Sequence, residues 1–513
     1  MVTELANQTL KPNGANTYSA VRWSAASKYG AMTVQFAVSL LLARLLAPEY
    51  FGLLGMAVVM TGFAKTLKSL GFNAAIIQRK DLDQALLSTL FWVNVGFCGF
   101  ITFMMILASP VAKWVYQDDR VAPLVAALAL NILIDSLGTV PSSLLQRRLE
   151  FKKLAIREIG GVTASAVVGV TCALSGFGVW SLALASITYS VTSVVLLNVV
   201  EPFLPSWIID RSRLMECLRF GLNITGFNIF NYFSKNADSL IIGAFLGPLA
   251  LGYYSLAHRC MVLPRNSMSR LIARVLFPKL SELQDADEKL ATAFLRTVCA
   301  IAIVTFPAMA GLALLADPFI RVFLGVKWLP AAPSVSMLAA VGAIQSLTFL
   351  SGPIYLCKGR ADWMFRWGIL ASITYVIAFL SGVQWGLNGV AFCYMTANLF
   401  LFLPEFAIPF KLVEGLTIGR LAKALAPFAI ATGVMIIAVF AVSYWATRYL
   451  GNTRMGTVLG ISVTTGVLTY AMTILAMRPP AVSDYCSLVF GSKMKARLPI
   501  ALFSKLLKDK GIN

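Results

Sequence analysis

Charged residues are scarce in this chain, and their scarcity excludes most soluble proteins. Asp, Glu, Lys and Arg make up 13% of its 513 residues, whereas hydrophobic residues make up 58%. Soluble proteins carry about 25% charged and roughly 45–50% apolar residues. A soluble fold has no interior large enough to bury so many apolar side chains, so lipid must be the solvent. We therefore expect an integral membrane protein.

Histidine and paired cysteine are also missing, which argues against metal and disulfide chemistry. The chain has one histidine, His258, and its eight cysteines are scattered singly without a CxxC motif. Such cysteines behave as small buried hydrophobes, and a lone histidine cannot build a His-rich metal site. We expect no metal and no cofactor.

Acidic residues are few relative to basic ones, with 23 Asp and Glu against 43 Lys and Arg. In a soluble chain this excess would suggest nucleic acid. Between membrane spans, however, basic residues set the orientation and contact anionic lipid headgroups. We therefore expect membrane lipids, and no nucleic acid, as partners. Residues 1–18 contain no apolar run and no small-residue cleavage site, so we expect no removable signal peptide.

Apolar stretches of about 20 residues, in contrast, are abundant, and this is the length that a helix needs to cross ~30 Å of hydrocarbon. They lie near residues 18–43, 50–70, 85–109, 121–142, 156–175, 179–200, 220–245, 252–277, 291–316, 331–356, 366–382, 386–410, 421–445 and 455–477. They predict an all-α integral membrane protein with about fourteen transmembrane helices.

Basic residues alternate between the segments that join these spans. One set of segments is rich in Lys and Arg. The opposite set holds only Arg44, Lys113, Arg120, Arg321, Lys327, Arg448 and Arg454. Because retained loops are rich in Lys and Arg, both termini should be cytoplasmic. The basic tail after Pro480 is typical of an amphipathic segment that lies on anionic lipid.

An internal repeat relates the two halves of the chain. Pro48 and Gly52 match Pro248 and Gly252 at an offset of 200 (248 − 48). Two further anchors follow in the same order, Ser136-Leu137 with Ser346-Leu347 and Gly178-Val179 with Gly389-Val390. The matches predict two repeated six-helix bundles with the substrate path at their interface, plus two C-terminal helices.

The repeat and the spans together predict the domain organisation. The predicted parts are a transmembrane bundle (1–200), a cytoplasmic connector (201–219), a second bundle (220–412), two additional transmembrane helices (413–480) and a cytoplasmic basic amphipathic tail (481–513).

Several strings of residues resemble one transporter family. They are Ile77–Asp81, Trp92–Gly96, Leu246–Pro248 with Gly252–Ala257, and Arg274–Pro278. At these strings the chain resembles the polysaccharide transporters of the multidrug/oligosaccharidyl-lipid/polysaccharide exporter superfamily, in particular the colanic acid exporters. The resemblance extends from about Arg22 to about Leu412.

The resemblance implies a multi-pass flippase of the bacterial inner membrane. Such a protein moves an undecaprenyl-diphosphate-linked oligosaccharide from the cytoplasmic to the periplasmic leaflet for exopolysaccharide or lipopolysaccharide biosynthesis. It further implies alternating access through a cationic central cavity that receives the diphosphate. A polysaccharide polymerase and glycosyltransferases are the protein partners that this function suggests.

Polar residues inside the spans are the candidates for that cavity, because a charged side chain costs about 2.5–3.5 kcal/mol there. The seventh span carries polar residues at spacings of three and four, which place them on one face of a helix. The first span, its counterpart in the repeat, carries polar residues at the corresponding positions. In the eighth span Arg suits bidentate phosphate binding, whereas Lys acts as a point charge. The candidate substrate-binding residues are Lys28, Gln35, Asn228, Asn231, Lys235, Arg259 and Arg265.

Three titratable residues are candidates for ion coupling, and each has a structural alternative. Asp238 either couples ions or neutralises Lys235 three residues earlier. Asp135 either couples ions or caps a helix break before Pro141. His258 is either a proton carrier or a structural hydrogen-bonding group. Lys28, similarly, either lines the cavity or extends to the membrane interface.

Two other functions compete with the flippase. A polymerase or ligase needs a large exported loop, but the longest one, about residues 317–333, has no His or Glu. We therefore expect no enzyme. A multidrug or metabolite exporter of the same superfamily shares the bundle plan and remains the alternative, although the excess of intramembrane cations favours an anionic substrate.

Overall fold

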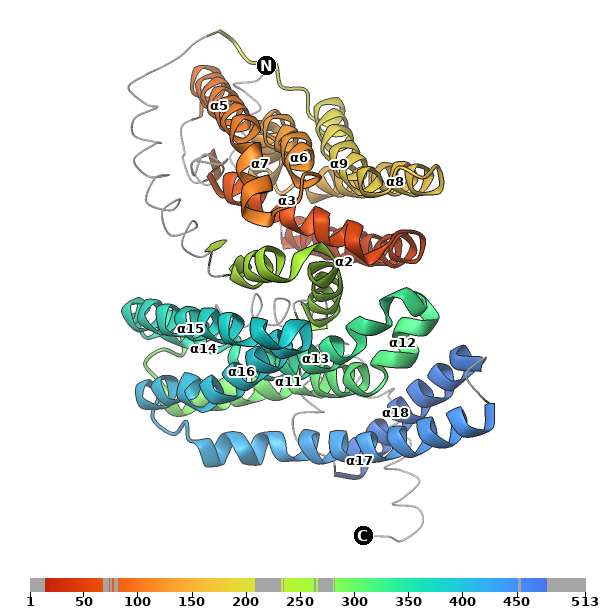
Figure 1. The fold of residues 1–513 in the computed structure, drawn as a ribbon. Helices are drawn as coiled ribbons and strands as arrows, with labels where there is room; N and C mark the ends of the chain where they lie inside the picture. Colours follow the sequence, from red (N-terminus) through yellow and green to blue (C-terminus); the bar gives the residue numbers. More distant parts are fainter. Residues whose placement is uncertain are drawn as a thin grey trace. The chain divides into compact units, whose positions relative to one another are not determined.

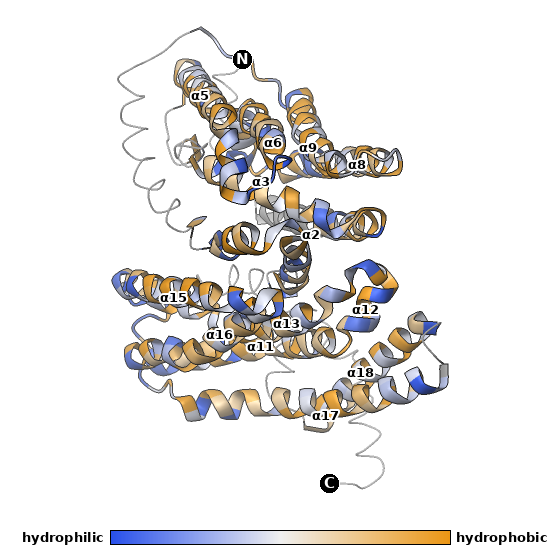
Figure 2. Cartoon of the chain, in the orientation of Figure 1, coloured by the Kyte–Doolittle hydropathy of each residue, from blue (hydrophilic) through white to orange (hydrophobic). Residues whose placement is uncertain are grey.

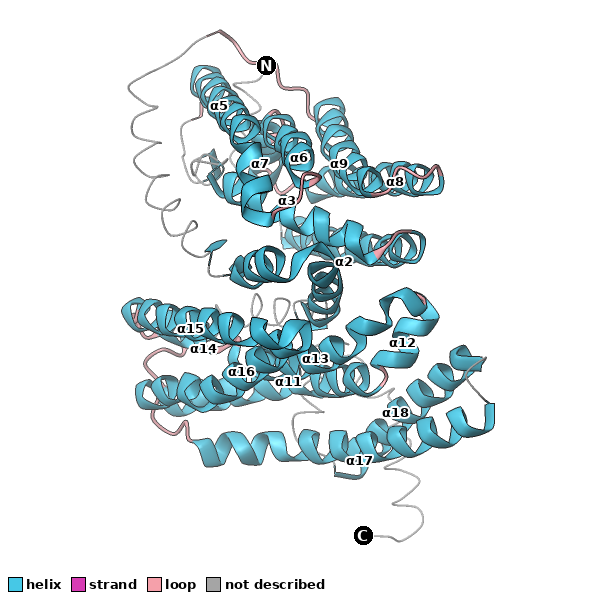
Figure 3. Cartoon of the chain, in the orientation of Figure 1, coloured by secondary structure: helices cyan, strands magenta, loops and turns pink. Residues whose placement is uncertain are grey.

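The structure is a computed structural model of the full chain. It describes residues 14–67, 73, 76–77, 82–207, 232–233, 235–262, 264–265, 280, 282–450 and 454–477. For residues 14–29 and 450 the description covers the backbone alone. Every regular element in these ranges is a helix (Figure 3), which confirms the predicted all-α fold. In hydrocarbon the backbone finds no water to bond, so a spanning chain satisfies its polar groups within helices.

The described helices, labelled in Figure 1, coincide with predicted apolar stretches. The predicted spans 220–245 and 252–277 lie partly outside the described residues. The helices described before residue 201 are α2 (Gly14–Leu45), α3 (Pro48–Leu67), α5 (Gln84–Tyr116), α6 (Val121–Ser136), α7 (Thr139–Arg147), α8 (Phe151–Leu174) and α9 (Val179–Val200). The helical stretch Lys235–Val262 comes next. The later elements are α11 (Asp287–Leu314), α12 (Ala316–Phe323), η1 (Val326–Ala331), α13 (Ala332–Thr348), α14 (Ser351–Cys357), α15 (Ala361–Gly382), η2 (Val383–Trp385), α16 (Gly386–Leu412), α17 (Ile418–Leu450) and α18 (Met455–Met477).

The chain packs as two compact units. The first unit comprises Met1–Leu256, Phe323–Pro330 and Phe379–Val390. The second comprises Ala257–Val322, Ala331–Ala378 and Ala391–Asn513. The domain boundaries drawn from the sequence remain a prediction.

Lipid is the solvent that this surface requires. Ten described helices are long and apolar enough to cross a membrane, or up to eleven with the bent pair α6 and α7. Large apolar side chains face outward, such as Phe103 (57% exposed) and Ile437 (71%), and hydrophobic colour covers most helices in Figure 2. Such a surface would drive association in water. The protein is therefore a multi-pass membrane protein, and the count of fourteen spans remains a prediction.

Two helix breaks lie where anchors of the predicted repeat fall. α6 ends at Ser136 and α7 begins at Thr139, with a bend of 47° between them. A helix break before Pro141 is what one of the two interpretations of Asp135 requires. In the second unit α13 ends at Thr348, just after Ser346-Leu347, and α14 begins at Ser351. The repeat itself remains a prediction.

The last two described helices belong to the second unit. α17 and α18 lie side by side (Figure 1), and α17 also packs along α11. Phe294 and Val298 of α11 are buried in one cluster with Phe428 and Met435 of α17. This apolar contact holds α17 against α11.

Candidate functional site

A buried hydrogen bond joins two residues of the stretch Lys235–Val262. Tyr254 Oη donates to Asp238 Oδ2 at 2.8 Å, and the N–H of Ser239 donates to Oδ1 at 2.6 Å. A straight helix would separate residues 16 apart by about 24 Å, so the chain must reverse between them. Gly247 supplies the reversal, because its φ of +80° is a conformation that glycine adopts without strain. Asp238 and Tyr254 are therefore held against each other across a hairpin.

The two proline-glycine motifs of the repeat meet at one crossing in the first unit. A Cβ atom added to Gly52 would overlap the carbonyl oxygen of Pro248. A Cβ added to Gly252 would overlap the carbonyl oxygen of Pro48. The contact is thus reciprocal, and glycine is required on both sides because backbone meets backbone. We call these four residues the glycine crossing.

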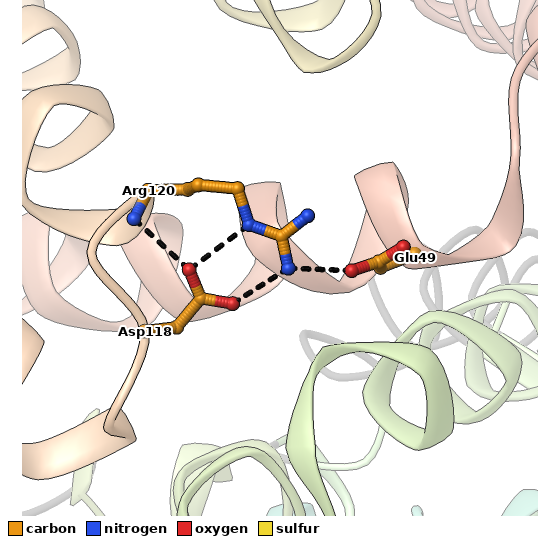
Figure 4. A network of polar contacts seen from close by, with 3 residues as sticks. All are labelled: Glu49, Asp118 and Arg120. Atoms are coloured by element: carbon orange, nitrogen blue, oxygen red, sulfur yellow. Dashed lines mark hydrogen bonds and ion pairs between the residues drawn. The ribbon is translucent and has the colours of Figure 1, made fainter.

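An ion-pair network lies beside this crossing at the end of the first unit that is predicted to be exported (Figure 4). Arg120 Nη2 lies 2.5 Å from Glu49 Oε1 at the start of α3 and 2.8 Å from Asp118 Oδ2. Arg120 Nε also donates to Asp118 Oδ1 at 3.0 Å. The side-chain hydrogen bond from Arg120 holds the pKa of Asp118 below its usual range. The network ties the loop before α6 to the beginning of α3.

A tryptophan from a distant part of the chain completes this end of the first unit. Trp328 is fully buried, and its Nε1 donates to the carbonyl oxygen of Ala43 in α2 at 2.6 Å. Its ring packs edge-on against Phe51 and Tyr253, with centroids 5.3 and 6.0 Å apart. The neighbouring Lys327 Nζ donates to the carbonyl oxygen of Arg44 at 2.7 Å. Segment 323–330 thereby bridges α2, α3 and the hairpin.

Arg265 enters a chain of polar side chains in the second unit. Its Nη1 donates to Gln345 Oε1 on α13. Gln345 Nε2 then donates to Tyr394 Oη at 2.8 Å and to Asn398 Oδ1 at 2.9 Å on α16. Tyr375 Oη of α15 also donates to Asn398 Oδ1, at 3.1 Å. The network fixes one edge of the Arg265 guanidinium, because Gln345 of α13 is itself held by Tyr394 and Asn398 of α16.

A carboxyl group lies in the same unit. Glu405 of α16 is half-buried, and its side chain lies next to Thr348, the last residue of α13. It therefore touches the point where α13 breaks before α14. Among the described residues no group of three or more His, Cys, Asp or Glu side chains is placed to hold a metal.

The sequence singled out some of these residues and missed others. Arg265 and Asp238 lie in the polar contacts described above. Glu405 was missed although it is an acid inside the predicted span 386–410, which is the same signal that singled out Asp135 and Asp238. The amides Gln345 and Asn398 were missed because they lie 53 residues apart on different helices, and the sequence does not show that they meet.

The remaining candidates lie apart or outside the described residues. Asn228 and Asn231 lie outside them, and of Lys28 only the backbone is described. Gln35 of α2, Lys235 and Arg259 are exposed, and His258 is half-buried. Asp135 lies half-buried in the last turn of α6, where its carbonyl oxygen accepts from the N–H of Gly138 at 3.2 Å. The roles assigned to all of these residues remain predictions.

Comparison with known proteins gives one sequence family. Residues 41–333 match the family described as polysaccharide biosynthesis protein. The chain is 30% identical over 481 residues to the teichuronic acid biosynthesis protein TuaB of Bacillus subtilis, covering 91% of this chain and 96% of that one. It is 29% identical over 406 residues to the lipopolysaccharide biosynthesis protein WzxC of Escherichia coli, covering 78% and 82%.

Solved structures share the fold at low sequence identity. The lipid II flippase MurJ in an inward closed conformation is 14% identical, with a TM-score of 0.69 over 90% of this chain and 100% of that one. An inward-facing multidrug resistance MATE family transporter is 14% identical, with a TM-score of 0.54 over 74% and 95%. These likenesses concern the fold alone.

Proposed function

The chain belongs to the polysaccharide biosynthesis protein family, and from this premise we propose that it flips lipid-linked oligosaccharides. The substrate is an undecaprenyl-diphosphate-linked repeat unit, which passes from the cytoplasmic to the periplasmic leaflet of a bacterial inner membrane. The relatives named for teichuronic acid and lipopolysaccharide biosynthesis support this substrate class. Both termini lie in the cytoplasm, and the protein acts as a transporter without a catalytic step.

The observation that carries the proposal is the guanidinium of Arg265 held inside a membrane bundle. Arg265 lies in the predicted span 252–277, and a cation inside a span costs free energy and persists where function needs it. A guanidinium can bind two phosphate oxygens at once, and fixing its plane beforehand lowers the ordering cost of binding. Gln345 supplies that fixing through its bonds to α16. In this role Arg265 binds the diphosphate, and Gln345 positions it.

The contacts of the first unit suit the closed side of an alternating cycle. The glycine crossing, the Arg120 network and Trp328 all lie at the end predicted to be exported. A headgroup can leave there only after these contacts separate. Each joins separate elements of the first unit, and in this proposal they separate and re-form in every cycle.

A multidrug or metabolite exporter is the second candidate, and the shared fold with the MATE family transporter supports it. The two functions make opposite predictions for Arg265. Phosphate binding requires the positive charge of the guanidinium and its paired N–H donors. Export of cationic drugs, in contrast, is opposed by an intramembrane cation. Drug resistance conferred by wild type that persists or rises in Arg265→Gln, without rescue of polysaccharide transport, would favour the second candidate.

The test is complementation in a strain that lacks its own repeat-unit flippase. Wild type, Arg265→Gln and Arg360→Gln are expressed, and surface polysaccharide is measured together with membrane insertion. Arg360 is the matched control, because it pairs with Asp362 at 3.1 Å on an exposed loop. We expect rescue by wild type and Arg360→Gln and at least a tenfold loss for Arg265→Gln. Full rescue by inserted Arg265→Gln would refute the phosphate role.

A further inference from the structure

A cavity of about 550 Å³ lies between α11 and α17 in the second unit. One part of its lining is apolar and consists of Leu314, Leu315, Val439 and Phe440. The other part is polar and is formed by Tyr444 and Arg448, one and two turns further along α17. Ligand pockets typically measure about 300–1,000 Å³, so the volume suffices for a small amphiphile.

The polar part carries a positive charge that no nearby acid balances. Arg448 Nη1 lies 3.4 Å from Tyr444 Oη. Within the described ranges no carboxylate lies at ion-pair distance from Arg448, and the sequence has no Asp or Glu from Gly415 to Ser483. The acid nearest in sequence to the apolar wall, Asp317, is paired with Arg321 at 2.6 Å. The cavity is therefore complementary to an anion.

Aromatic side chains indicate the depth of the cavity in the membrane. Tyr444, Trp445 and Tyr449 are exposed, and the rings of Trp445 and Tyr449 stack with centroids 5.6 Å apart. Exposed Trp and Tyr gather at the level of lipid headgroups. Val439 lies nine residues before Arg448, which is about 13 Å along a helix. The polar part is thus at the headgroup level, and the apolar part extends into the hydrocarbon.

We propose that this cavity binds an anionic phospholipid of the leaflet at the Arg448 end of α17. Its phosphodiester accepts hydrogen bonds from Arg448 and Tyr444, and one acyl chain lies along Val439, Phe440 and the end of α11. The lipid then bridges α11 and α17 and stabilises the packing of the last two helices. The proposal holds for either transported substrate, because no residue of the Arg265 network takes part.

The test uses the purified full-length protein, stripped of lipid in an uncharged detergent. The thermal unfolding midpoint is measured with phosphatidylglycerol, phosphatidylcholine or undecaprenyl phosphate for wild type, Arg448→Gln and Ser443→Phe. Ser443 lines the cavity, so the phenylalanine fills it while the charge stays. Arg454→Gln is the matched control, since Arg454 is an exposed arginine at the same end and outside the lining.

A bound lipid that favours the folded state raises the midpoint. We expect phosphatidylglycerol to raise the midpoint of wild type and Arg454→Gln by about 3 °C and to leave Arg448→Gln and Ser443→Phe unchanged. An equal shift with phosphatidylcholine, an undiminished shift in Arg448→Gln, or an equal loss in Arg454→Gln would overturn the proposal. A larger shift with undecaprenyl phosphate would overturn it in favour of the polyprenyl carrier.

Discussion

Gly52 packs directly against the backbone carbonyl of Pro248, with no space for a side chain between them. Gly252 makes the same contact with Pro48. These four residues are the ones that align the two halves of the sequence at an offset of 200 (248 − 48). The matching motifs thus meet at a single place, where neither backbone can rotate away from an added side chain.

Alanine at Gly52 or Gly252 should loosen the glycine crossing. The new methyl group would overlap a carbonyl oxygen, and overpacking of this kind costs about 1–3 kcal/mol. We expect the thermal unfolding midpoint to fall by about 3 °C or more. Gly96→Ala in α5 is the control, because the position of its Cβ is open. A fall in Gly96→Ala as large as in the other two variants would contradict the steric argument.

The sequence predicts the helices well because their signal is local. The apolar stretch near 421–445 lies within α17, because a continuous apolar segment of this length favours a spanning helix. A helix break precedes Pro141, because proline is disfavoured inside a helix. Contacts between distant helices carry no such signal. Gln345 is an ordinary amide in the sequence, and its role becomes visible only through its hydrogen bond to Asn398 on another helix. Likewise, the residue that accepts the hydrogen bond of Trp328 lies 285 residues away in the chain.

Two tryptophans illustrate this limit and give a matched pair of variants. Trp328 is fully buried, whereas Trp114 of α5 is 81% exposed. Trp328→Ala should lower the free energy of unfolding by about 3–5 kcal/mol, the usual cost of truncating a buried tryptophan. Trp114→Ala should change it by less than about 0.5 kcal/mol. Denaturant titration of both proteins in the same detergent checks this, and similar midpoints would show that the Trp328 contact contributes little.

The pKa of Asp118 gives a prediction for acid stability. Its carboxyl group has a lower pKa when folded, next to Arg120, than the ~3.9 expected when unfolded. The stabilisation is therefore present above about pH 4 and is lost as the pH falls through the lowered folded pKa. Because the network is partly exposed, the contribution is about 1 kcal/mol. Asp118→Asn should flatten the acid side of a plot of unfolding midpoint against pH.

Asp119 provides the control for that measurement. It pairs with Lys113 at 2.7 Å, but the two side chains are 77% and 60% exposed, so solvent screens the pair. Asp119→Asn should follow the wild-type curve between pH 3 and pH 7. If Asp119→Asn flattened the curve as much as Asp118→Asn, general surface charge would be the cause rather than the bond to Arg120.

Gln345 separates a positioning role from a direct one. Gln345→Leu keeps Arg265 and its charge but removes both the acceptor for Nη1 and the donor to Tyr394 and Asn398. If the network orients the guanidinium, transport should fall at least tenfold while membrane insertion persists. The exposed Gln384→Leu at η2 is the control. In the Arg265→Gln background the Gln345 change should then cost little, because residues that act as one unit are not additive. Equal losses from Gln345→Leu with and without Arg265 would mean that Gln345 acts on something other than this arginine.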